Sequence, residues 1–222
     1  MAATTPSMPV VTPKKRKWGD LAVVTLVVGE TKTTFHVHEA ELFAASPVFK
    51  AAFGSDFKES SERKMTLPED DAELFNLMVE WIYHRRYDLP PRTGDKIKNG
   101  ARYMESMRLY VLADKYGVTS LKNCIVKTIF DTLRDGEVAG TNLETVAYVY
   151  QNAPQNSGIR KLLADLYACN INFDWYGREE SKLELQKYPE FAIDILRSFA
   201  QHTSQKDVKN SFEGEMPKAY EK

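Results

Sequence analysis

The first regular pattern in the chain is an apolar run, then a polar turn and a second run. Residues 20–28 read DLAVVTLVV, a β-branched stretch of strand length. Gly29 to Lys32 supply turn residues, and a second strand begins at Thr33. The pattern predicts a β-hairpin that leads the chain to His38.

Two short helical patterns follow this hairpin without a linker. Residues 39–45 have helical spacing, and Ser46 is placed to cap the helix that comes next. Pro47 occupies its first position, where the missing N–H does no harm, and Gly54 ends it. Such a compact joint between strand and helices is typical of a binding module and not of a catalyst.

Longer helices are predicted in the middle of the chain. Asp70 and Glu73 form a capping-box pattern that opens a helix ending near His84. Its apolar face consists of Leu74, Met78, Trp81 and Ile82. Residues 85–100 are polar and contain Pro and Gly, so we predict an inserted loop there. Two more helices follow, and Gly136 closes the second.

The C-terminal part has helical patterns and no repeat of the first half. Thr141 and Glu144 form another capping-box pattern, Ser157 opens a further helix, and Pro189 begins the last one. Residues 201–222 are polar, and we expect them to fray.

Spaced residues in the first half resemble the signature of the BTB/POZ domain. They are Asp20, Phe35, His38, Leu42, Ser46, Phe49, Phe57 and Glu59. Eight ordered positions at matching spacing are far more specific than a lone short motif. The resemblance covers roughly residues 18–129, and it implies structural roles for Asp20, His38 and Ser46, with His38 hydrogen-bonded where the hairpin meets the helix.

The resemblance also implies a fold class and a division of the chain. We expect an α+β fold in which helices surround a small sheet with a β-hairpin, followed by an all-α extension. The expected parts are a flexible basic tail at 1–17, a BTB/POZ-like domain at 18–130, a helical extension at 131–203 and a polar tail at 204–222. The extension is similar to helical segments that follow BTB domains in adaptor proteins, in particular short fungal members.

Composition limits the size and setting of the protein. With 222 residues and 43% apolar content, the chain can bury one core plus a smaller helical satellite, but no second enzyme-sized domain. The apolar run at 21–28 has eight residues, well short of the roughly 18 that cross a bilayer. Without a secretion signal or a membrane span, we expect a soluble intracellular protein in which Cys124 and Cys169 are reduced and buried.

The net charge of the chain is −1, but the charged residues are distributed unevenly along it. The first 17 residues hold Lys14, Lys15, Arg16 and Lys17 and no acid, whereas the remainder carries 26 basic and 31 acidic residues. Because the body of the protein lacks a basic face, direct nucleic-acid binding is not expected. The basic cluster resembles a nuclear import signal, and its alternative interpretation is a solvated arm. The expected location is nuclear or nucleocytoplasmic.

A search for catalytic motifs finds none. Residues 94–100 fail as a phosphate-binding loop, since the two glycines have five residues between them and no Lys-Ser/Thr pair follows. His36 and His38 share one side of a strand, but they lack the further ligands that a metal site needs. We therefore expect neither an enzyme nor a cofactor or metal site.

The candidate functional residues come from the family resemblance. Phe57 and Glu59 resemble the hydrophobic-x-Glu element with which many BTB domains engage cullin-3, and Phe49, Phe53 and Tyr116 are further candidate cullin-side residues. The predicted function is a non-catalytic substrate adaptor of a cullin-3 type ubiquitin ligase that also holds an unknown target protein. The alternative interpretation is that Phe57 packs in the core and Glu59 is one of several solvated acids.

Two departures from the family pattern change the expected self-association. The segment at 1–17 contains three prolines and no apolar period, so the helix that forms the usual swapped dimer is missing. Glu39 stands where many dimeric, transcription-repressing members have a basic residue paired with the position of Asp20. Self-association is possible, but the usual swapped dimer is not expected. The alternative function is a nuclear scaffold or transcription cofactor that associates through the BTB domain without ligase binding.

Overall fold

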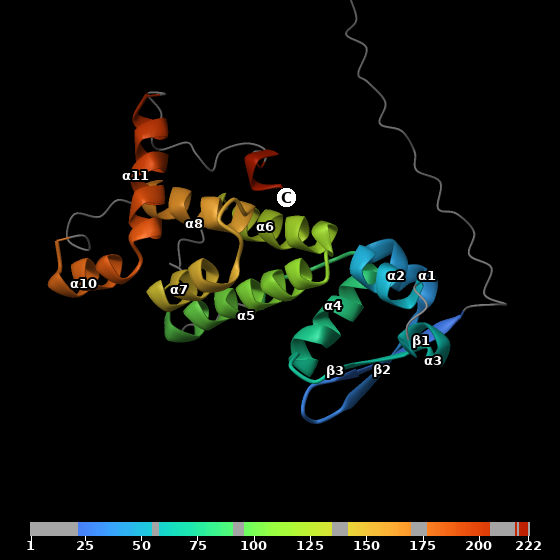
Figure 1. Cartoon of the computed structure of the whole chain (residues 1–222). Coiled ribbons are helices and arrows are strands. Elements are labelled where there is room, and N and C mark those ends of the chain that lie inside the picture. Colours follow the sequence, from blue (N-terminus) through green and yellow to red (C-terminus); the bar gives the residue numbers. More distant parts are fainter. Residues whose placement is uncertain are drawn as a thin grey trace, which may run out of the picture.

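The structure is a computed structural model of the chain (Figure 1). It describes residues 22–54, 58–90, 96–134, 142–169, 177–204, 216 and 218–221. A small sheet with its covering helices lies at one end, helices of the extension lie at the other, and α5 (Lys96–Lys115) and α6 (Thr119–Arg134) connect the two ends.

The sheet has three strands in the order β2-β1-β3. The hairpin is formed as predicted, with β1 (Val23–Val28) antiparallel to β2 (Thr33–His38) and Val23 opposite His38. Strand β3 (Lys64–Leu67) runs parallel to the other side of β1. The period-2 pattern of β1 buries Val24, Leu26 and Val28. This buried face is what the helices cover.

The joint after the hairpin consists of α1 (Glu39–Ala45), α2 (Pro47–Gly54) and the short α3 (Lys58–Glu62). Ser46 caps α2 as predicted, because its Oγ accepts a hydrogen bond from the Phe49 N–H at 3.1 Å. The bounds of α2 agree with the roles expected of Pro47 and Gly54.

Helix α4 (Ala72–His84) ends where the sequence predicts but begins with a different cap. Asp71, and not Asp70, accepts hydrogen bonds from the Glu73 and Leu74 N–H groups at 2.9 and 3.2 Å. The neighbouring acid instead reaches across the fold, where its carboxylate contacts Lys115 at 2.8 Å and accepts from the Tyr116 hydroxyl. Asp71 thus caps α4 and also pairs with Arg108 at 2.8 Å, whereas the contacts given for Asp70 are with the end of α5.

The predicted loop at 85–100 is shorter than expected, because α5 already begins at Lys96. The described part of the segment is also packed: Tyr87 is buried, and its hydroxyl lies 2.8 Å from the Ser106 Oγ. Helix α6 ends at Arg134, and the predicted closure at Gly136 lies outside the described residues.

The extension is helical, as expected. It comprises α7 (Leu143–Asn152), α8 (Gly158–Cys169), α10 (Glu179–Lys187), α11 (Pro189–Ser204) and the single turn η1 (Lys218–Tyr220). Asn142 caps α7 by accepting from the Thr145 N–H at 2.9 Å; Thr141, the predicted cap, lies outside the described residues. The fraying expected for the last residues is wrong in part, because Tyr220 is buried.

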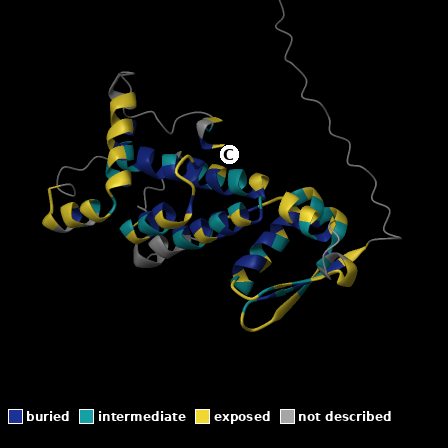
Figure 2. Ribbon diagram, in the orientation of Figure 1, coloured by how far each residue is buried: buried dark blue, intermediate teal, exposed yellow. Residues whose placement is uncertain are grey.

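A single buried cluster runs through both parts of the chain, from Val24 in the sheet to Tyr220 in η1. Helix α5 contacts α4, α6 and α7, and α6 contacts α8. Figure 2 shows buried residues continuing along α4, α5, α6 and α8. The extension therefore shares its core with the sheet-bearing half.

Candidate functional site

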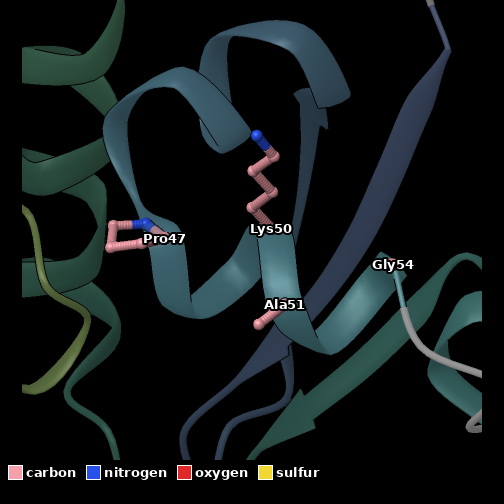
Figure 3. A pocket seen from close by; sticks show the side chains of 4 residues that line it. All are labelled: Pro47, Lys50, Ala51 and Gly54. Atoms are coloured by element: carbon pink, nitrogen blue, oxygen red, sulfur yellow. The ribbon is translucent and has the colours of Figure 1, made fainter.

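The outward side of α2 forms a continuous exposed surface beside the joint between α5 and α6. Pro47, Lys50, Ala51 and Gly54 follow the i, i+3, i+4, i+7 spacing of one helical face and line a shallow pocket of about 430 Å³ (Figure 3). Val48 next to them is 42% exposed. We call these five residues the α2 face.

Three aromatic residues that we predicted to contact cullin lie beneath this surface and not on it. Phe49, Phe53 and Tyr116 are all buried. The rings of Phe49 and Tyr116 stack with centroids 4.5 Å apart, and Phe53 stacks on Phe43 at 5.9 Å. Burying this large aromatic area stabilises the core, and the predicted cullin-side role of the three residues stays a prediction.

These buried residues nevertheless position the α2 face. The Ser46 Oγ donates a hydrogen bond of 2.6 Å to the Tyr116 carbonyl, which ties the start of α2 to the end of α5. Gly117 follows with φ +66°, and a Cβ there would lie 3.1 Å from the Pro47 ring. This close approach with positive φ explains a glycine at the turn and holds the α2 face against it.

The Tyr116 hydroxyl completes the same joint. Burial, together with the hydrogen bond to Asp70 and the charge of its carboxylate, raises the pKa of Tyr116 well above its ordinary value. The phenol stays a neutral donor, and the nearby Lys115 ammonium balances the buried carboxylate. The contacts of Asp70 with Lys115 and Tyr116 thus hold the start of α4 against the end of α5.

Of the predicted cullin-binding element, the structure describes Glu59 but not Phe57. Glu59 is half-buried on α3, which contacts α2, whereas Phe57 lies outside the described residues, in the segment between these two helices. Asp20 and the basic cluster Lys14, Lys15, Arg16 and Lys17 also lie outside the described residues. The predicted roles of these six residues stay predictions.

His38 has the structural role that the resemblance implies. Its backbone N–H donates to the Tyr83 hydroxyl at 2.9 Å, and its ring Nδ1 lies 2.8 Å from the same oxygen. The Glu39 carboxylate forms an ion pair of 3.0 Å with Arg63, the residue that precedes β3. His36 lies 3.3 Å from the Thr25 Oγ1 and not beside another metal ligand.

Within the described parts of the chain, no three His, Cys, Asp or Glu side chains gather in a way that could hold a metal ion. Nor does any helix there have the length and apolar character needed to cross a bilayer. In the described part of the chain neither Cys124 nor Cys169 forms a disulfide, and both are half-buried, less buried than predicted.

Our sequence analysis missed a second polar cluster, in the extension. Asp165 on α8 accepts from Ser198 and from Tyr220, each at 2.5 Å, and all three residues are buried. Arg160, also buried, donates to the Tyr150 carbonyl at 2.6 Å and contacts Glu190 at 2.8 Å. The available signal was an acidic residue between Leu162, Leu163 and Leu166 on the apolar face of α8.

Comparison with known families agrees with this architecture. A family model described as BTB/POZ domain matches residues 14–129, which is more than half of the chain. The protein belongs to the BTB/POZ family. It therefore contains a protein–protein interaction module, in accord with an exposed helical face held on a rigid aromatic core.

Curated relatives match the chain over the same region. TD and POZ domain-containing protein 3 of Mus musculus is 36% identical over 110 residues, which cover 45% of this chain and 27% of that protein. Kelch repeat and BTB domain-containing protein 4 of Homo sapiens is 31% identical over 87 residues, or 39% of this chain and 14% of the relative. The chain thus spans about a quarter or less of the length of these relatives.

Proposed function

We propose that the protein is a non-catalytic substrate adaptor that binds cullin-3 through the α2 face and the adjoining segment with Phe57 and Glu59. The observation that carries this proposal is the exposed α2 face with its shallow pocket. The hydrophobic-x-Glu sequence follows directly on an exposed helical face that is backed by buried aromatic residues.

The physical basis is an aromatic anchor within a small, firmly supported surface. Such anchors supply most of the binding energy at interfaces, and the surrounding contacts exclude water. The pocket along Pro47, Ala51 and Gly54 offers apolar surface, while Lys50 can pair with an acidic group of the partner. Because Ser46 and Tyr116 hold α2 in place, binding would cost little reorganisation.

The test is quantitative co-purification of cullin-3 with variants of the full chain. We expect Phe57→Ala/Glu59→Lys and, separately, Ala51→Glu to weaken binding at least about tenfold, since loss of an interface hot spot costs about 2 kcal/mol or more. The matched charge control is Glu30→Lys, an exposed residue in the hairpin turn, which should leave binding unchanged. Unchanged recovery with both surface variants would contradict the assignment of the site.

No recovery of cullin-3 by the unaltered chain would favour the alternative function, a nuclear scaffold or transcription cofactor that associates through its BTB domain.

For either function we propose nuclear import through Lys14, Lys15, Arg16 and Lys17. Replacing all four residues with Ala should shift a fluorescent fusion from the nucleus to the cytoplasm. An unchanged distribution would leave the cluster as a solvated arm.

A further inference from the structure

The end of the chain returns to the extension and inserts one aromatic side chain into it. Helix turn η1 lies against α8, near α6 (Figure 1). Tyr220 is only 2% exposed, whereas Lys218 and Glu221 on either side are exposed and Met216 is half-buried. Tyr220 is therefore the most deeply buried of the terminal side chains whose exposure the structure describes.

The site that receives Tyr220 is complementary to both parts of a tyrosine. The ring packs against Phe130 with centroids 5.9 Å apart, and the Lys161 ammonium lies 5.7 Å from the ring centroid. The hydroxyl donates to Asp165 Oδ2 at 2.5 Å, and Lys161 contacts the same oxygen at 3.2 Å. Ser198 donates to the other carboxylate oxygen, so the acceptor is oriented from both sides.

The site also accommodates the peptide backbone of its occupant. A Cβ on Gly158, the first residue of α8, would lie 1.9 Å from the Tyr220 carbonyl oxygen. No larger side chain fits there while the segment is docked. We call Phe130, Gly158, Lys161, Asp165 and Ser198 the tyrosine slot.

Space for a longer occupant adjoins the tyrosine slot. A pocket of about 400 Å³ is lined by Lys161, Asp165 and Ser198 of the slot. It continues along Gln155, Asn156 and Arg197. The pocket lining thus adds hydrogen-bond donors and acceptors next to the carboxylate that binds the hydroxyl.

We propose that the tyrosine slot is a binding site for a tyrosine-bearing peptide of a partner protein, and that the chain's own C-terminal segment is its intramolecular competitor. A role of the slot in holding an adaptor's target rests on the proposed function. Binding of the peptide to the slot does not depend on that function. One aromatic anchor with one buried hydrogen bond is a replaceable contact, typical of an interface hot spot. A tethered occupant has an effective concentration of the order of mM, which an external peptide must overcome.

The chemistry of the slot also defines what it rejects. Burial and the Asp165 carboxylate raise the pKa of Tyr220, so the hydroxyl remains a proton donor. A phosphorylated tyrosine would place two negative charges against the same buried carboxylate. The slot therefore selects unmodified tyrosine, and phosphorylation of a partner peptide would release it.

The experiment measures binding of a fluorescent peptide with the sequence of residues 212–222 to the full chain by anisotropy. We expect the Tyr220→Ala chain to bind it at least tenfold more tightly than the unaltered chain, whose slot is occupied. If Tyr220→Ala loses helix content by circular dichroism, Tyr220→Phe replaces it, because loss of the hydroxyl bond alone weakens the competitor. Absence of peptide binding to a folded variant would overturn the proposal.

Changes in the peptide test the slot without altering the protein further. Peptides with Phe or phosphotyrosine in place of tyrosine should bind the Tyr220→Ala chain at least about tenfold more weakly, since a charge-assisted hydrogen bond is worth about 1.5–3 kcal/mol. Equal binding of the phosphopeptide would contradict recognition by Asp165. In the protein, adding Gly158→Val should abolish binding, whereas Leu196→Ala, at a 66% exposed position of α11, should not.

Cullin-3 co-purification with the same Tyr220→Ala chain separates the two proposals. Recovery should be unchanged, because the tyrosine slot and the α2 face share no residue. Peptide binding without cullin-3 recovery would contradict the adaptor function alone. Cullin-3 recovery without peptide binding would contradict the slot alone.

Discussion

The sheet-bearing half and the helical extension stabilise their interiors in different ways. Around Phe75, the first half assembles an aromatic cluster in which Phe35, Phe49 and Tyr116 lie with ring centroids 5.2–6.3 Å away. In the described extension, by contrast, two charged residues are buried, Arg160 and Asp165, both on α8. The first half relies mainly on apolar area, with the Asp70–Tyr116 hydrogen bond at its margin, whereas the described extension also buries whole charged residues.

This difference predicts different responses to substitution. An apolar core loses stability in proportion to the volume removed, and neighbouring groups relax in part. A buried charge depends on each partner, because removing one leaves the others desolvated and unpaired.

The largest effect should come from the aromatic cluster. We expect Phe75→Ala to lower the free energy of unfolding by about 3–5 kcal/mol, because the fully buried ring leaves a cavity. Urea denaturation followed by circular dichroism measures the change. Phe199→Ala at a partly exposed position of α11 is the control and should cost less than half as much. Equal losses would contradict the packing described for the core.

Removing the carboxylate in the extension should rank second. Asp165→Ala leaves the buried Ser198 and Tyr220 hydroxyls without their acceptor, so we expect a loss of about 2–4 kcal/mol. Glu179→Ala, which removes an exposed ion pair with Lys182, should cost less than about 1 kcal/mol.

The same cluster offers a sharper test of the mechanism. Replacing donors and acceptor together, as in Asp165→Leu/Ser198→Ala/Tyr220→Phe, should recover at least half of the loss, because unpaired polar groups no longer remain. Denaturant midpoints of the single and triple variants decide the matter. A triple variant less stable than Asp165→Ala would show that the cluster contributes through shape and not through pairing.

A smaller effect is expected where the start of α2 is tied to the end of α5. Ser46→Ala removes the cap of α2 and the hydrogen bond to the Tyr116 carbonyl, and we expect a loss of about 1–2 kcal/mol. Thermal and urea unfolding measure it, with the exposed Ser61→Ala on α3 as a control that stays within about 0.5 kcal/mol. A cost no larger than that of the control would contradict the role of Ser46.

The smallest effect should depend on pH. Burial alone would raise the pKa of Asp71, but the Leu74 and Glu73 N–H groups and Arg108 lower it below 3.8. Because the folded pKa is the lower one, this contribution is complete above the unfolded pKa and is lost as the pH falls through the folded value. The Asp71→Ala variant should be less stable by about 1 kcal/mol at pH 6, and the difference should shrink below pH 3.8. Unfolding measured from pH 6 to pH 3 tests this, and a constant difference would contradict it.

Local sequence signals predicted most elements of the fold. The hairpin, the Ser46-Pro47 restart, the end of α4 at His84 and the start of α11 at Pro189 all agree with the structure. These features depend on side-chain period, caps and proline geometry, which act within a few residues. The sequence did not decide which of two adjacent residues caps α4, because Asp70 and Asp71 are both aspartates. In the structure, Asp70 instead makes long-range contacts with Lys115 and Tyr116.

The role of Phe57 and Glu59 stays a prediction from the family spacing, and the exposed α2 face was not predicted from the sequence. Sequence could not separate Phe49, Phe53 and Tyr116 from surface anchors, because an aromatic ring suits a core and an interface equally well. Tertiary packing against Phe43, Phe75 and one another decides that these three rings are buried.

By itself, the sequence determined the BTB/POZ core, the helical character of the extension and the element expected to bind a partner. Only the tertiary structure decided that the last residues dock, that Tyr220 meets Asp165 and Ser198, and that the outward side of α2 is the accessible one. The physical reason is range. Period, capping and turn preferences are properties of neighbouring residues, whereas burial and buried hydrogen bonds depend on partners 33 to 55 positions away.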